Sequence, residues 1–415
     1  MLTDLHEAHF PEVYARFTEL LQGKPWLKAT EKLRPHLKAN PLSLARIQNE
    51  YGVAYGLTHF DRDGMSLADS KVWPTVQQAM SYAAQVCGLV ENAKDEKGKK
   101  AYLGRISGSF SNPEEMRAIR FEHLTAMVLH HRGAHIEWPD ECSGPERFDL
   151  LVSAEDILTF EVECKSCSSD KGRPITTKDA SELLNRLTKD LLADVSSRDI
   201  LVLKVRVPKR LPTAHKDLDS LAAEVAAAFR EGKDSTEVGV LLAHANLAAP
   251  AAPVPPEEMM HVIYGAASHV FGEPEGHRAI VYNEKKSLSL CIEVCSGRSA
   301  QFFNAVWETA KHAVQDQMTK LRPGCLVLRL EGISKDELQH LAGETPNSLA
   351  WFATKVLGDV RHEHLACLAY VSDEEMVSLN SGSETAQTST YVFESPVGKY
   401  SKSGIGQFFM GSPRI

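Results

Sequence analysis

Apolar and polar positions divide the chain into a helical part followed by parts in which strands and helices alternate. Residues 1 to about 105 show the apolar spacing of helices, most clearly over 14–21 and 75–90. A further helix is predicted to begin at Asn112-Pro113, a capping residue followed by proline at the first helical position. It is expected to end near His131, before Gly133.

The pattern over 134–371 predicts an α/β fold. Strands are expected at 134–138, 147–152, 157–165, 200–207 and 238–245, with helices at 178–195 and 218–230. The run 246–258 is rich in alanine and proline and indicates a domain boundary. Beyond it, strands are expected at 288–294, 325–330 and 365–371, helices at 300–321 and 335–356, and an irregular tail at 381–415.

These elements predict a helical N-terminal region over 1–106, an α/β domain over 107–246 and a C-terminal α/β region over 258–415. The last region repeats the strand and helix order of 157–245, with Cys291-Ile292-Glu293-Val294-Cys295 at the position of a charged cluster. A degenerate repeat and ordinary α/β alternation both explain this order.

Composition narrows the class of protein. The chain has 415 residues, of which 43% are hydrophobic and 24% charged, as expected for a globular protein with more than one domain. Its formal net charge of −9 argues against nonspecific coating of nucleic acid but permits a local basic groove. No apolar run approaches the roughly 18 residues of a membrane span, and no signal peptide is evident, so we expect a cytoplasmic protein. The eight cysteines are expected to be reduced thiols.

Charged residues interrupt the most apolar predicted strand. Glu161, Glu163 and Lys165 alternate with Phe160, Val162 and Cys164, so one face of the strand should pack while the other carries charge. Charged side chains are seldom fully buried unless they are paired or bind a metal. The charged face is therefore either solvated, with ion pairs across strands, or part of a functional site.

Asp149 can join this charged face across a hairpin. It must then lie opposite Glu161 or Glu163, which requires an odd-length connection between the strands or a β-bulge. Two carboxylates and an ammonium suit phosphodiester hydrolysis, because Mg²⁺ binds through one or two carboxylates together with substrate phosphate. The ammonium can orient or deprotonate the nucleophile, or stabilise charge in the transition state.

The sequence Asp149-Leu150-Leu151-Val152 followed by Glu163-Cys164-Lys165 resembles the PD-(D/E)xK nuclease superfamily. The resemblance implies a restriction-endonuclease-like mixed sheet flanked by helices, and the order helix, three strands, helix, strand over 112–207 is similar to that core. It also implies that Asp149 and Glu163 bind Mg²⁺, for which Mn²⁺ can substitute, and that Lys165 is the catalytic lysine.

The chain departs from the family pattern at two points. Pro145 lies four positions before Asp149 instead of directly before it. The predicted helix after the strand offers Lys178, Glu182 and Arg186 in place of a glutamine motif.

Glu122 projects from a mostly apolar stripe of the helix that begins at Pro113. Many members of the superfamily carry a helix glutamate that reaches the metal, so the resemblance makes Glu122 a third ligand. The alternative is a salt bridge to a neighbouring arginine such as Arg147. Glu161 is the next candidate ligand, or else a supporting or exposed residue.

Residues 161–216 hold a local excess of basic side chains, in which Lys171, Arg173, Lys204 and Arg206 are candidates to bind substrate phosphates or are merely solvated. We therefore expect a Mg²⁺-dependent nuclease acting on DNA in preference to RNA, as a monomer or a homodimer. The alternative is a binding scaffold for nucleic acid or protein on a nuclease-like fold that does not cut.

Overall fold

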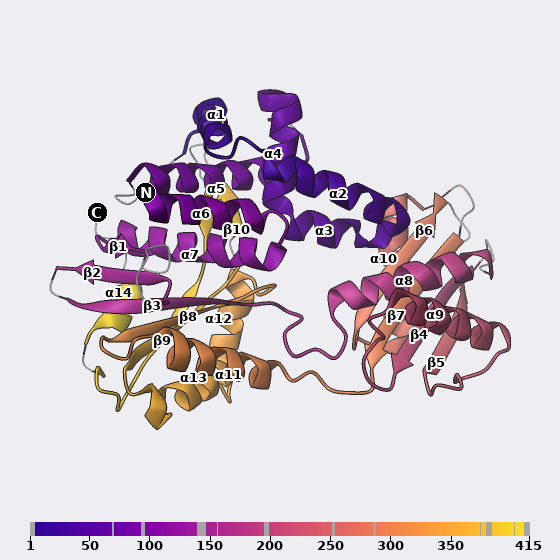
Figure 1. The fold of residues 1–415 in the computed structure, drawn as a ribbon. Coiled ribbons are helices and arrows are strands. Elements are labelled where there is room, and N and C mark those ends of the chain that lie inside the picture. The colour runs from indigo at the N-terminus through magenta and orange to yellow at the C-terminus, as the bar shows by residue number, and fades with distance from the viewer. Residues whose placement is uncertain are drawn as a thin grey trace. The chain divides into compact units, whose positions relative to one another are not determined.

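The computed structural model describes residues 5–68, 70–92, 96–138, 147–155, 157–194, 199–250, 254–284, 288–373, 375–378, 384–401 and 403–410. The chain forms two compact units (Figure 1). Unit 1 comprises Met1–Lys32, Glu50–Lys171 and Phe303–Ile415, and unit 2 comprises Leu33–Asn49 and Gly172–Phe302. Both units are α/β, and each has a sheet of mixed strand direction flanked by helices.

The N-terminal region is helical, as predicted. Its helices are α1 Phe10–Leu20, α2 Pro25–Ala39, α3 Leu44–Glu50, α4 Gly52–Asp63, α5 Trp73–Asn92 and α6 Glu96–Ser109. Aromatic rings of Phe17, Trp26 and Phe110 pack together in the core of unit 1. None of the helices in the described ranges is long and apolar enough to cross a membrane.

Helix α7, Pro113–His131, confirms the predicted capping pattern. The Asn112 side chain accepts hydrogen bonds from the backbone N–H groups of Glu114 and Glu115 at 3.2 and 3.4 Å. After the helix, Gly133 has a φ of +86°, which glycine adopts without the steric penalty of a Cβ. The helix packs against the sheet of unit 1.

Within the described residues, six strands form the sheet of unit 1 in the order β1-β2-β3-β8-β9-β12. The first three run antiparallel, β3, β8 and β9 run parallel, and β12 returns antiparallel to β9. The strands are β1 His135–Glu137, β2 Leu150–Ala154, β3 Ile157–Cys167, β8 Gly324–Leu330, β9 Leu365–Val371 and β12 Thr390–Glu394.

The remaining elements of unit 1 come after residues 172–302, which belong to unit 2. They are helices α11 Phe302–His312, α12 Lys335–Gly343, α13 Ser348–Leu357 and α14 Ile405–Met410, a π-helical turn Ala313–Gln317, and strands β10 Glu375–Ser378 and β11 Glu384–Gln387. The predicted helix over 335–356 is wrong as one element, because it breaks into α12 and α13 near Pro346, where the ring removes a helix donor. The irregular tail is also wrong, since β11, β12 and α14 lie within it.

Unit 2 has a sheet in the order β5-β4-β7-β6 with helices on both faces. Leu183 of α8 and Val225 of α9 belong to the apolar cluster on one face, and Ile263 of α10 belongs to the cluster on the other. The elements are α8 Thr177–Leu191, β4 Asp199–Val207, α9 His215–Arg230, β5 Leu241–Ala248, α10 Pro256–Phe271, β6 His277–Asn283 and β7 Leu288–Ser296.

The division of the chain differs from the predicted boundaries in all three regions, since Leu33–Asn49 of the first and residues 258–302 of the last belong to unit 2. Residues 246–258 do not separate domains, because β5 extends to Ala248 and α10 begins at Pro256 within the same unit. The expected 107–246 domain is split, because β3 pairs in parallel with β8 and not with β4, whose parallel neighbour is β7. Local periodicity identifies strands but carries no information on which distant strand each one pairs with.

His123 on α7 is a buried titratable group in unit 1, with 4% of its surface exposed. Its Nε2 lies 2.7 Å from the Tyr102 hydroxyl oxygen, and its ring stacks on Tyr82 at 5.7 Å. Burial, together with the positive charges of Arg105 and Arg120, lowers the pKa of His123 to about 3. The folded protein therefore holds this imidazole neutral.

The stability of the protein should fall in acid because of His123. The unfolded chain protonates this histidine near its ordinary pKa of about 6.5, whereas the folded chain does so only near 3. Between these values the unfolded state binds the extra proton, so stability should drop by about 1.4 kcal/mol per pH unit. The raised pKa values of Asp149 and Glu163 act in the opposite direction, so the test is the difference between two proteins. In urea unfolding from pH 7 to pH 4, the stability of the wild type should fall relative to that of His123→Phe by this slope, and identical pH dependence in the two proteins would contradict the prediction.

Candidate functional site

The register of the β2–β3 hairpin places Asp149 in line with Glu163. Leu150 pairs with Val162 and Leu151 with Glu161, and Asp149 is the residue immediately before Leu150. The register shifts between Val152 and Ala154, so of the two arrangements that would align Asp149, an odd-length connection or a β-bulge, the structure has the bulge. Asp149 is tied to the neighbouring strand, because its Oδ2 accepts a hydrogen bond from the Cys164 N–H at 2.7 Å.

The charged face of β3 is buried and not solvated. Glu163 has no exposed surface and Asp149 is 8% exposed, whereas the Lys165 side chain reaches solvent with 23% of its area. Lys165 Nζ forms an ion pair with Glu163 Oε1. Glu163 Oε2 is buried and has no hydrogen-bond partner in the described part of the chain. The alternative of a solvated strand face is therefore wrong.

The three groups strongly perturb one another. Burial raises the pKa of Asp149 well above its usual range, and the charges of Glu122 and Glu163 raise it further. Burial also raises the pKa of Glu163 to about 7, although Lys165 opposes this rise. For Lys165, burial lowers the pKa, but the charges of Glu163 and Asp149 outweigh burial and the net shift is upward. Such a cluster of perturbed groups is typical of functional sites.

Glu122 lies close enough to affect these pKa values, but both of its carboxylate oxygens are paired. Arg105 on α6 donates from Nη2 to Glu122 Oε1 at 2.7 Å and from Nη1 to Oε2 at 3.0 Å. Arg105 Nε also donates to Glu115 Oε1 at 2.5 Å. The alternative to a metal ligand, a salt bridge from Glu122 to an arginine, is therefore what the structure has, with Arg105 and not Arg147 as the partner.

The predicted ligand set of Asp149, Glu163 and Glu122 is consequently not assembled. No three His, Cys, Asp or Glu side chains among the described residues are grouped to hold a metal. The donors that remain are the carboxylates of Asp149 and Glu163, including the unpartnered Oε2. Two such hard oxygen donors fit Mg²⁺, which binds through one or two carboxylates and keeps several waters.

Glu161 is neither an exposed residue nor a free ligand. It has no exposed surface, and its Oε2 accepts a hydrogen bond from the Thr319 N–H at 2.8 Å. Its Oε1 accepts from the Thr319 hydroxyl and lies 3.3 Å from Arg322 Nη1. Glu161 thus holds the loop that leads into β8.

The predicted phosphate-binding residues divide between the two units. Lys171 belongs to unit 1, and Arg173, Lys204 and Arg206 belong to unit 2. Lys204 Nζ lies 2.8 Å from a Glu275 oxygen, and Arg206 Nη2 lies 2.5 Å from the other. The structure therefore commits Lys204 and Arg206 to ion pairs, while Arg173 is exposed and Lys171 partly so.

Unit 2 neutralises a carboxylate at a comparable sheet position. Glu293 is buried on β7, and Arg278 on β6 lies directly opposite it, with Nη2 2.6 Å from Glu293 Oε2. Lys204 on the parallel neighbour β4 lies 3.3 Å from Glu293 Oε1. Where unit 1 sets Asp149 against Glu163, unit 2 thus sets an arginine against Glu293.

Sequence reasoning missed Arg105 and Arg278. Arg105 pairs with a residue of another helix, and Arg278 with one across a hairpin, so neither contact leaves a periodic signal. The described cysteines are free and buried, Cys164 and Cys167 among them. Pro145 lies outside the described residues.

Comparisons with protein-family models, curated proteins and solved structures found no match to this chain.

The Arg105–Glu122 pair should contribute strongly to the stability of unit 1. Arg105→Gln leaves a buried carboxylate without its partner, and we expect a loss of about 3 kcal/mol in the free energy of unfolding. Adding Glu122→Gln removes that unpaired charge, so the double variant should recover part of the loss. Denaturant unfolding would measure both, and a single variant as stable as the wild type would contradict the role of this pair.

Proposed function

We propose that unit 1 is a metal-dependent nuclease that hydrolyses phosphodiester bonds in nucleic acid, with DNA preferred to RNA. The observation that carries this proposal is the buried cluster of Asp149, Glu163 and Lys165, which the hairpin register brings to one place. Keeping charged groups out of water is unfavourable unless they are paired or bind a ligand, and one oxygen of Glu163 has no partner.

Each group of the cluster has a role in this proposal. Asp149 and Glu163 would hold Mg²⁺ or Mn²⁺ through their carboxylate oxygens. When bound, the metal would act as a Lewis acid on the scissile phosphate and activate a water. Lys165 remains charged because its pKa is raised, and its partly exposed ammonium would stabilise negative charge on the phosphate.

The order of elements supports a restriction-endonuclease-like fold for the core of unit 1. Helix α7, strands β1, β2 and β3, helix α11 and strand β8 follow the order helix, three strands, helix, strand. Residues 172–302 of unit 2 are inserted between β3 and α11. The segment before β8 carries Gln315 and Gln317, whereas the predicted helix 178–195 has no glutamine.

A binding scaffold that does not cut is the second candidate. The observation that favours it is the Arg105–Glu122 pair, which removes one carboxylate from the expected ligand set. Under this alternative the protein would bind nucleic acid in a manner that does not depend on divalent metal. For either candidate we propose that the protein is cytoplasmic and that it can form a homodimer.

A cleavage assay tests the nuclease proposal. The purified full chain should cut plasmid or linear DNA, single-stranded DNA or RNA when Mg²⁺ or Mn²⁺ is added and should not cut in EDTA. Lys165→Ala, Asp149→Asn and Glu163→Gln should each lower the rate at least about 100-fold, because each removes charge that acts on the transition state.

Lys233→Ala is the matched control for Lys165→Ala, since Lys233 is an exposed lysine of unit 2 paired with Glu231. It should cut at the wild-type rate. Cleavage that survives Lys165→Ala would show that another nuclease is present or that the assignment is wrong. Metal-independent binding without cleavage would support the scaffold instead.

Metal binding can be measured without any substrate. Mg²⁺ should raise the melting temperature of the wild type, because a cation between Asp149 and Glu163 relieves their repulsion. At a concentration about 100 times its Kd, the gain should be about 2.7 kcal/mol. Potassium chloride of equal ionic strength is the control. An equal shift in Asp149→Asn, or no shift in the wild type, would contradict this metal site.

A further inference from the structure

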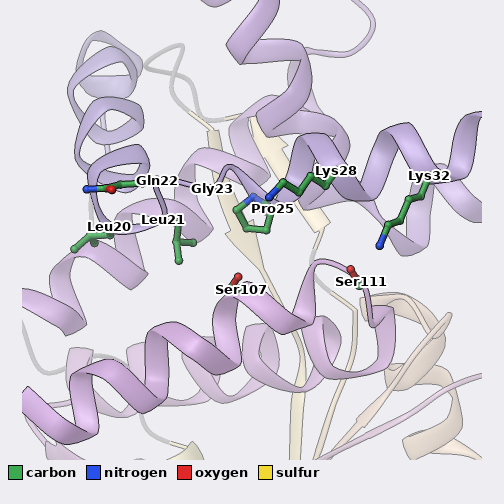
Figure 2. A pocket seen from close by; sticks show the side chains of 9 residues that line it. All are labelled: Leu20, Leu21, Gln22, Gly23, Pro25, Lys28, Lys32, Ser107 and Ser111. Carbon is green, nitrogen blue, oxygen red and sulfur yellow. The ribbon is translucent and has the colours of Figure 1, made fainter.

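A surface groove of about 420 Å³ lies on unit 1, between α2 and the end of α6. Figure 2 shows Lys28 and Lys32 extending from α2, and the hydroxyls of Ser107 and Ser111 directed toward that helix from α6 and the turn after it. The groove is lined by Leu20, Leu21, Gln22, Gly23, Pro25, Lys28, Lys32, Ser107 and Ser111.

The polar side chains of the groove have no partners within the described residues. Lys28 and Lys32 form no ion pair there, and the hydroxyls of Ser107 and Ser111 make no hydrogen bond. By contrast Lys24, just before α2, lies 2.5 Å from Asp61. The lining contains no carboxylate, although the chain as a whole carries a net charge of −9. The groove therefore concentrates uncompensated positive charge and hydroxyl donors.

These groups match the chemistry of a phosphodiester backbone. Ammonium groups neutralise phosphate charge, and serine hydroxyls donate hydrogen bonds to phosphate oxygens without reading base sequence. A carboxylate-bearing partner would satisfy the lysines as well, but the nuclease-like site in the same unit favours nucleic acid.

We propose that this groove binds backbone phosphates of the nucleic acid away from the cleavage point, an inference that rests on the proposed function. Helix α6 carries both Arg105, which contacts Glu122, and Ser107 of the groove. Residues two apart project about 200° apart around a helix, so these side chains point to opposite sides of α6. The groove thus contributes to substrate binding and not to the chemical step.

The test measures binding separately from cleavage. The full chain carrying Lys165→Ala is titrated in EDTA with fluorescent single-stranded DNA, duplex DNA and RNA of one sequence, over a series of salt concentrations. Adding Lys28→Ala and Lys32→Ala should weaken binding to all sequences and reduce the salt slope for duplex DNA by about two, roughly one for each lost phosphate contact.

The matched control replaces Lys100 and Lys399, two exposed lysines of unit 1 outside the groove, and should leave the slope nearly unchanged. In a chain that keeps Lys165, the two groove substitutions Lys28→Ala and Lys32→Ala should raise KM for cleavage and leave kcat unchanged.

The groove proposal would be overturned if the salt slope is unchanged by Lys28→Ala and Lys32→Ala, or if replacing Lys100 and Lys399 reduces the slope equally. Either result would count against the groove even if the wild type cuts DNA. A wild type that binds no nucleic acid would overturn it too. A reduced slope in a protein that never cuts would support the groove and refute only the nuclease proposal.

Discussion

The burial of Glu163 is the constraint on which the site in unit 1 depends. This carboxylate lies on a strand with neighbours on both sides, β2 and β8, and has no exposed surface. Its charge is tolerated because Lys165 pairs with one oxygen, and its pKa is raised because burial disfavours the ionised form. A second carboxylate, Asp149, adds repulsion that only a cation or a proton can relieve.

The two units treat a buried strand carboxylate in opposite ways. In unit 2, Glu293 meets Arg278 on one side and Lys204 on the other, so its negative charge is compensated within the protein. In unit 1, the negative charge is only partly compensated. Arg105 pairs with Glu122, so Lys165 is the cation that lies beside both Asp149 and Glu163. A buried carboxylate whose charge is only partly compensated is suited to bind a ligand, whereas one whose charge is fully compensated stabilises the fold. The chemistry we propose is therefore placed in unit 1.

Individual elements show which parts of the structure can be predicted from neighbouring residues in the sequence. The helix Pro113–His131 and the strand Ile157–Cys167 follow from a proline, a capping asparagine and an alternating pattern, all of which are properties of neighbouring residues. The pairing of β3 with β8 joins residues far apart in the chain, with unit 2 between them in sequence. No local signal specified that pairing, so the expected domain boundaries differed from the observed units.

The sequence by itself determined the α/β class, most elements, and the packed and charged faces of β3, and it limited the alignment of Asp149 with Glu163 to an odd-length connection or a bulge, of which the structure has the bulge. Only the tertiary structure decided that the charged face is buried, that Arg105 occupies Glu122, and that Lys204 and Arg206 are engaged in ion pairs. The reason is physical: alternation and capping act between residues close in the chain, whereas burial and charge compensation depend on which distant segments meet.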